Sequence, residues 1–194
     1  MNRLLFSHAA RAGFLAGAIG LICLAGPLAA AAQPAPASRD GSHDFDFNFG
    51  VWHTHIKRIA NPFSGGDRST ELDGTVTVRK VWGGRAQIEE IKADGPDAHL
   101  EGLTLFIYNP QAGQWSQAFS SSDGASSDDP LVGAFKDGRG ELFAKDTFDG
   151  RTILVRGEWS DITPDAHRFE EFLSDDGGAS WHPEFIAQLT RLSH

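Results

Sequence analysis

The chain has 194 residues, with 26 acidic against 17 basic side chains and a formal net charge of −9. An acidic chain without a basic cluster is a poor partner for nucleic acid or an anionic membrane surface, so neither is an expected partner. The single cysteine, Cys23, excludes a disulfide within the chain.

The first 32 residues are predicted to be a signal peptide. Arg3 and Arg11 are basic, an apolar run from 13 to 24 follows, and small residues precede a cleavage site expected after Ala32. Cleavage removes two positive charges and no negative ones, which takes the net charge from −9 to −11. We therefore expect an exported protein, periplasmic or secreted, that is not inserted in a membrane once the signal is removed.

Residues 33–42 are rich in proline and alanine and are predicted to be a disordered linker. Residues 43–194 then form one domain of ordinary size. A domain of this length can bury a sizeable hydrophobic core, so it does not need a disulfide.

From residue 43 onward the sequence predicts strands almost throughout. Alternating apolar and polar residues recur, and short groups of Gly, Asp, Asn or Pro interrupt them. Asp137-Gly138 and Asp149-Gly150 are hairpin signals because both residue types tolerate positive φ. A short helix is expected around 44–49. The ten predicted strands are 49–59, 69–82, 85–93, 100–108, 114–121, 131–136, 140–148, 151–160, 167–174 and 181–192.

This succession predicts an all-β domain, a single antiparallel up-and-down barrel of about ten strands. Closing the sheet hides the strand edges that would otherwise pair with other chains. A two-sheet β-sandwich is the alternative.

Four stretches carry a resemblance to a known family: FDFNFGVW, LFIYNPQAGQW, WSDITPDAHRFEEFLSDDGGASW and FIAQLTR. Together they resemble a family of uncharacterised, mostly exported bacterial domains of the calycin-like barrel type, grouped with lipocalins, fatty-acid-binding proteins and nitrobindins. The resemblance spans roughly residues 45 to 191. It implies a calycin-like barrel, and it implies no reaction.

The resemblance also implies a structural pair, Trp52 and Arg191, because lipocalins close the barrel floor with a tryptophan of the first strand and an arginine of the last. Alternation puts Trp52 on one face with Thr54 and Ile56. A guanidinium stacked on the indole would contribute ~0.5–2 kcal/mol. The alternative is a plain core tryptophan and an exposed arginine. The inner row predicted for the last strand is Trp181, Phe185, Ala187, Leu189 and Arg191.

His53 and His55 have the spacing of two metal ligands on one face of a strand. They alternate with Trp52, so an inward tryptophan puts both histidines outside the barrel, where a third ligand is missing. They are therefore weak metal candidates, and we expect no metal. We also expect no cofactor. Haem would need an inward histidine on a late strand, whereas His182 alternates with the apolar inner row and His167 lies at a strand start.

Carboxylates within the strands leave two interpretations open. In the adjacent pairs Glu89-Glu90 and Glu170-Glu171, one side chain must face in and the other out. Arg156 and Glu158 share one face; they are either an interior pair that orients a ligand or an ion pair on the wet outer face. An enzyme would need Glu90, Glu158 or Glu170 inside a pocket with a raised pKa.

We predict that the barrel binds a small apolar or amphipathic molecule in its interior. Binding would come from burial against aromatic and aliphatic side chains, with few polar groups for orientation. One alternative is an envelope hydrolase or isomerase that uses buried carboxylates. Another is a purely structural envelope protein with a filled interior. The candidate ligand-binding residues are Trp115, Gln117, Phe119, Arg156, Glu158 and Phe185.

Overall fold

The computed structural model describes residues 40–65, 68–124 and 129–193. The predicted signal peptide and most of the predicted linker lie outside the described residues. Within them, the structure has no helix with the length and apolar character needed to cross a membrane.

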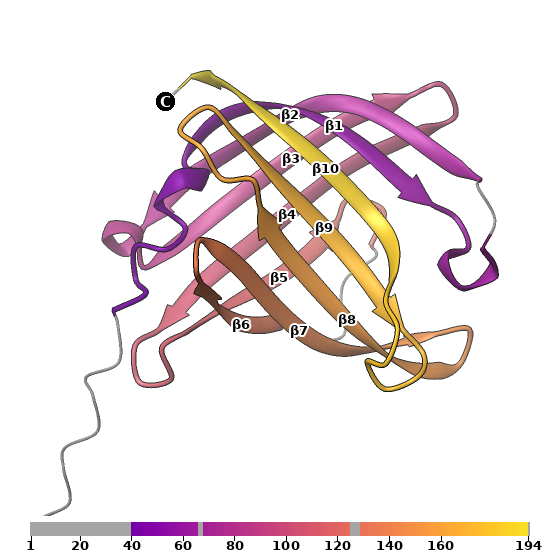
Figure 1. The fold of residues 1–194 in the computed structure, drawn as a ribbon. Helices are drawn as coiled ribbons and strands as arrows, with labels where there is room; N and C mark the ends of the chain where they lie inside the picture. Colours follow the sequence, from indigo (N-terminus) through magenta and orange to yellow (C-terminus); the bar gives the residue numbers. More distant parts are fainter. Residues whose placement is uncertain (1–39, 66–67, 125–128, 194) are drawn as a thin grey trace, which may run out of the picture. The chain divides into compact units, whose positions relative to one another are not determined.

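The described residues form ten strands and three short 3₁₀ helices (Figure 1). No strand end differs from its predicted position by more than two residues. The helices are η1 (Asp46–Asn48), η2 (Pro62–Ser64) and η3 (Trp82–Gly84). The strands are β1 (Gly50–Ile59), β2 (Ser69–Val81), β3 (Ala86–Gly95), β4 (Ala98–Asn109), β5 (Gln114–Ser121), β6 (Leu131–Lys136), β7 (Arg139–Phe148), β8 (Arg151–Ser160), β9 (Ala166–Ser174) and β10 (His182–Ser193).

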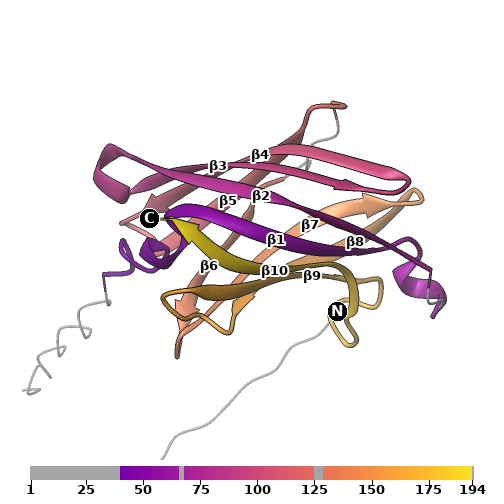
Figure 2. The ribbon, with the colours of Figure 1, turned by 90° about the horizontal axis from the view of Figure 1, so that it is seen from above.

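Each strand pairs antiparallel with the next one along the chain, and β1 pairs with β10, so the sheet closes on itself. Figure 2 shows β1 lying between β2 and β10, which are its two partners. The predicted all-β up-and-down barrel is confirmed, and the alternative sandwich is wrong because one continuous ladder joins all ten strands.

The tight turns follow from residues that accept a left-handed backbone. Asp137 and Gly138 have φ of 53° and 79°, and Asp149 and Gly150 have φ of 49° and 74°. Two consecutive residues with positive φ match the right-handed twist of the flanking strands, which is why such pairs favour two-residue hairpins. These turns fix the registers of β6 with β7 and of β7 with β8.

One end of the barrel is closed by residues 41–49, which precede β1 and are called here the N-terminal plug. Phe45 of the plug is fully buried. Its ring centroid lies 4.9 Å from that of Phe106, 5.1 Å from Trp115 and 5.2 Å from Trp159. Because these rings come from three different strands, the plug ties together distant parts of the wall.

Hydrogen bonds hold the backbone of the plug in place. The Trp115 indole N–H donates to the Gly41 carbonyl at 2.9 Å, and the Gly41 N–H donates to the Tyr108 hydroxyl at 3.0 Å. The Gln87 amide donates to the Phe45 carbonyl at 3.0 Å. These side chains satisfy polar backbone groups that would otherwise be buried without a partner, which costs about 1–3 kcal/mol each.

Arg191 and Trp52 meet beneath the plug. The guanidinium carbon of Arg191 lies 3.8 Å from the Trp52 ring centroid. Nη1 donates to the Phe49 carbonyl at 2.6 Å, Nη2 to the Phe47 carbonyl at 2.9 Å, and Nε to the Pro164 carbonyl at 2.6 Å. Arg191 therefore joins the last strand to the first, to the plug and to the loop before β9.

Candidate functional site

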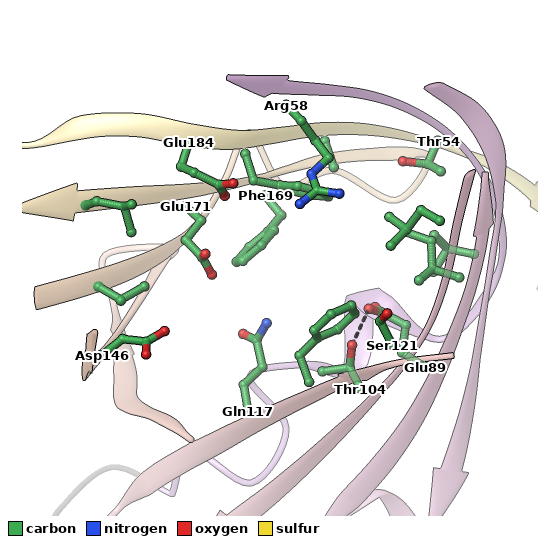
Figure 3. A pocket seen from close by; sticks show the side chains of 18 of the residues that line it. Thr54, Arg58, Glu89, Thr104, Gln117, Ser121, Asp146, Phe169, Glu171 and Glu184 are labelled. Atoms are coloured by element: carbon green, nitrogen blue, oxygen red, sulfur yellow. Dashed lines mark hydrogen bonds between the residues drawn. The ribbon is translucent and has the colours of Figure 1, made fainter. Parts of the chain in front are cut away.

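The barrel contains a cavity of about 350 Å³ (Figure 3). Trp159 lines this cavity and also packs against Phe45 of the plug, so it separates the two. Strands β1 to β5 and β7 to β10 all contribute side chains to its wall. This volume lies at the lower end of the range usual for small-molecule sites, about 300–1,000 Å³. The apolar part of the wall includes Ile91, Phe119, Val155, Phe169, Leu173 and Phe185.

Glu89 of β3 brings a carboxyl group to the wall of this cavity. Its Oε1 accepts a hydrogen bond from the Thr104 hydroxyl at 3.0 Å, and its Oε2 accepts one from the Asn48 amide at 3.4 Å. Burial raises the pKa of Glu89, and the two hydrogen bonds offset that rise only in part. The carboxyl therefore holds its proton to a higher pH than an exposed glutamate does.

Four further carboxyl groups line the cavity, those of Asp123, Asp146, Glu171 and Glu184. The last three lie around the same space as Arg58 (Figure 3). Burial and, to a smaller extent, the negative charges of Glu184 and Asp146 raise the pKa of Glu171 to about 7, against the lowering effect of Arg58. Burial also raises the pKa of Glu184, again against Arg58. Near neutral pH, Glu171 can therefore take up or release a proton, or serve as a counter-charge for a cation.

A β-bulge in β10 places Glu184 in the wall of the cavity. Pro183 pairs with Phe172 and Phe185 pairs with Glu171, so Glu184 is an extra residue with no partner in the register. Such a residue breaks strict alternation, and Glu184 and Phe185 both line the cavity.

The bulge also changes the predicted inner row of β10. The row holds for Phe185, Ala187 and Leu189, which line the cavity. It fails at Trp181, whose ring lies 4.7 Å from the Arg156 guanidinium. One residue inserted between Trp181 and the regular part of β10 moves the tryptophan to the outer face.

The structure brings three of the six predicted ligand-binding residues to the cavity: Gln117, Phe119 and Phe185. Trp115 faces inward as well, but it is fully buried against the plug and does not reach the cavity. Gln117 and Phe119 follow it on the same face of β5, nearer the open space.

Arg156 and Glu158 lie outside the cavity, contrary to the interior interpretation. The apolar residues Val155 and Trp159 of β8 line it, and alternation then turns Arg156 and Glu158 outward. Glu158 lies 2.7 Å from an Arg139 nitrogen and 3.9 Å from one of Arg156. These charges form an ion-pair network on the outer surface of the sheet.

Alternation along the strands also corrects the prediction of which carboxylates face inward. The predicted candidates Glu90 and Glu170 face outward; Glu90 lies 3.7 Å from Lys92, and the Arg168 guanidinium donates to Glu170 at 2.7 Å. Their neighbours in sequence, Glu89 and Glu171, are the members that line the cavity. The sequence shows that one residue of each pair faces inward, but it gives no signal for which one does.

His53 and His55 lie beside Asp73 on the outer face of β1 and β2. His53 Nε2 is 3.4 Å and His55 Nδ1 is 3.1 Å from Asp73 Oδ1. Within the described residues, no group of three or more His, Cys, Asp or Glu side chains is placed to hold a metal ion.

Three polar atoms of residues that line the cavity have no hydrogen-bond partner among the described residues: Thr54 Oγ1, Gln117 Oε1 and Trp159 Nε1. Thr54 is fully buried, Gln117 is 7% exposed and Trp159 is 2% exposed. Buried polar atoms are normally paired, so these three are free to contact a molecule in the cavity. Gln117 was a predicted ligand contact, whereas Thr54 was predicted only to face inward.

No family model matches the chain, and no curated protein matches it. Similar solved structures include EF1p2_mFAP2b bound to DFHBI, with 8% identity, a TM-score of 0.43, and coverage of 78% of this chain and 98% of the other. A fluorescence-activating β-barrel of de novo design has 15% identity, a TM-score of 0.42, and coverage of 78% and 97%. The S-type phycobiliprotein lyase CPES from Guillardia theta has 12% identity, a TM-score of 0.49, and coverage of 76% and 89%. At these identities the likeness concerns the fold alone.

Proposed function

We propose that this protein binds a small amphipathic molecule with a mainly apolar body inside its barrel, and that it does so after export. The support for binding is the cavity of about 350 Å³. Protein interiors are close-packed, so a barrel selected for stability alone would be filled by side chains. An open, largely apolar interior with a few polar groups is the usual form of a small-molecule site.

The distribution of polar groups supports an amphipathic ligand. Phe169 and Phe185 form an apolar wall, with ring centroids 6.1 Å apart. Glu89 contributes a carboxyl group from β3, and Glu171 contributes one from β9. An apolar body gains about 25 cal/mol for each Å² that it removes from water, while the polar groups would fix its orientation.

Export is the part of this proposal that rests on the predicted signal peptide, residues 1–32. It predicts that the mature protein begins after Ala32 and is recovered from the periplasm or the medium. A mature chain that retains residues 1–32 in the cytoplasm would contradict it.

The binding proposal is tested by filling the cavity. Ala187 lines the cavity and is 4% exposed, so a phenylalanine at this position should occupy the space that a ligand needs. We expect the neutral solvatochromic dye Prodan to bind the unaltered protein one to one, with a blue-shifted emission. We expect Ala187→Phe to weaken binding about tenfold or more.

The matched control is Ala118→Phe, because Ala118 is exposed on the outer face of β5. It adds the same side chain without entering the cavity, so dye affinity should stay unchanged. If the unaltered protein binds no dye, or if Ala187→Phe binds it equally well, the interior is not the binding site. The structural alternative would then be favoured.

A further inference from the structure

Several carboxyl groups lie in the part of the cavity away from the plug. Glu171 from β9, Glu184 from β10 and Asp146 from β7 all line it, and Arg58 from β1 lies among them (Figure 3). Asp123 and His99 also line the cavity. In the described part of the chain, Arg58 forms no salt bridge with Glu171, Glu184 or Asp146. When these three carboxyl groups are ionised, three negative charges therefore face the positive charge of Arg58.

Gln117 is an independent sign of a missing donor. Its side chain projects into the cavity (Figure 3), it is 7% exposed, and its Oε1 has no hydrogen-bond partner among the residues that the structure describes. An amide oxygen can only accept hydrogen bonds, and leaving a buried acceptor unpaired costs about 1–3 kcal/mol. A ligand that carries N–H donors would remove that cost.

The classes of ligand can be compared on this basis. An anion would be repelled by Glu171, Glu184 and Asp146. A neutral apolar molecule would desolvate these carboxylates and leave them unpaired, which is costly. In the part of the chain that the structure describes, no set of side chains is placed to hold a metal ion. A protonated amine supplies both the positive charge and the N–H donors.

The surroundings also suit the rest of such a molecule. Phe169 and Leu173 lie on the inner face of β9 on either side of Glu171, and Phe185 pairs with Glu171 from β10. An ammonium group close to aromatic faces gains about 0.5–2 kcal/mol from cation–π attraction. The apolar body would then extend along Val155 and Phe119, which line the same space.

We propose that the ligand of this cavity is an organic cation: a protonated amine with an apolar body, whose ammonium group lies among Glu171, Glu184 and Asp146 and donates to Gln117 Oε1. This inference rests on the proposed function, since it requires the interior to be a binding site. It adds the chemical class of the ligand and the residues that select it.

Three molecules that share one apolar body test the proposal: 4-phenylbutylamine, 4-phenylbutanol and 4-phenylbutyrate. Their affinities are measured by isothermal titration calorimetry at pH 8, where Glu171 is largely ionised. We expect the amine to bind about tenfold more tightly than the alcohol, and the carboxylate to bind most weakly. Glu171→Gln should bring the amine and the alcohol to similar affinities while leaving the alcohol's affinity unchanged.

Two further variants distinguish a specific change in amine binding from damage to the fold. Glu170→Gln makes the same chemical change one residue away on the outer face, where Glu170 pairs with Arg168, and it should preserve the preference for the amine. Arg58→Gln removes the positive charge beside the carboxylates and should tighten amine binding, which a damaged fold would not do.

The outcomes separate the two proposals. If all three molecules bind with similar affinity, or if the alcohol binds best, the preference for cations is overturned and the binding function stands. If none of the three binds, the preference for cations is overturned, and Prodan binding decides whether the binding function stands. If the amine preference survives Glu171→Gln and Glu184→Gln alike, the ammonium group does not lie among these carboxylates.

Discussion

Burial moves the pKa values of Glu171 and His167 in opposite directions. It is the main reason that the pKa of Glu171 rises to about 7, and together with the charge of Arg191 it lowers the pKa of His167 to about 3. The unfolded state takes up a proton at His167 as the pH falls below about 6.5, so this residue lowers stability toward acid. Glu171 lowers stability toward higher pH instead. The unfolded state releases the Glu171 proton above about pH 4.5, so the free energy of unfolding falls as the pH rises to about 7.

Replacing Glu171 should therefore stabilise the protein in a pH-dependent way. We expect Glu171→Gln to raise the free energy of unfolding by about 1–3 kcal/mol at pH 8, because the buried charge is gone. At pH 4 the gain should disappear, since Glu171 is then protonated in both states. The charged groups that face it are Glu184 from β10, Asp146 from β7 and Arg58 from β1; Gly157, its partner on β8, carries no charge.

Urea unfolding at the two pH values measures this difference, and Glu170→Gln is the control. That variant breaks a surface ion pair with Arg168, so it should give no stabilisation at pH 8. A gain for Glu171→Gln that is equal at pH 8 and pH 4 would show that the ionisation of Glu171 is not its cause.

At the scale of single elements, regular alternation is what the sequence makes visible. The ten strands and the Asp137-Gly138 and Asp149-Gly150 hairpins follow from alternation and turn residues, and both are found in the structure. The sequence contains no comparable signal for the bulge at Glu184. Neither the position of the bulge nor the outward orientation of Trp181 interrupts the local alternation of apolar and polar residues. Whether Glu170 or Glu171 faces inward depends on which alternate residues of β9 point to the interior. Packing across the barrel decides this.

The N-terminal plug is a second feature that local pattern does not reveal. The sequence predicts a short helix at its position, and η1 confirms that helix, but insertion of Phe45 between distant strands depends on the closed barrel. We expect Phe45→Ala to lower the free energy of unfolding by about 3–5 kcal/mol, because it leaves a void in a fully packed aromatic cluster. Phe143→Ala is the matched control, since Phe143 is 44% exposed on the outer face.

The control should cost about 1 kcal/mol or less, and urea unfolding midpoints compare the two variants directly. If the two substitutions cost the same, the plug covers the barrel end without stabilising it. The fold would then depend on the strand ladder and on the contact between Arg191 and Trp52.

At the scale of the whole barrel, the number of paired residues differs from one pair of neighbouring strands to another. The closing pair, β1 and β10, runs in unbroken register from Trp52 with Arg191 to Arg58 with Phe185, and after a register shift Val51 pairs with Ser193. The pair β5 and β6 is joined only from Trp115 with Gly133 to Gln117 with Leu131. The remaining residues of β5 include Phe119 and Ser121, which line the cavity. The shortest ladder among the described residues therefore lies beside the proposed binding site.

Local opening is easiest where the fewest backbone hydrogen bonds must break. We expect hydrogen–deuterium exchange to be faster in β6 and in β5 beyond Gln117 than in β1 and β10, by about tenfold or more for the slowest amides of each pair. Prodan bound in the cavity should slow exchange in β5, because Gln117 and Phe119 line the binding space. Ala187→Phe with added dye is the control, since the dye should then give no protection. Exchange that is faster in β1 and β10 would instead place the weakest point of the barrel at its closing ladder, and the route to the cavity would have to be sought there.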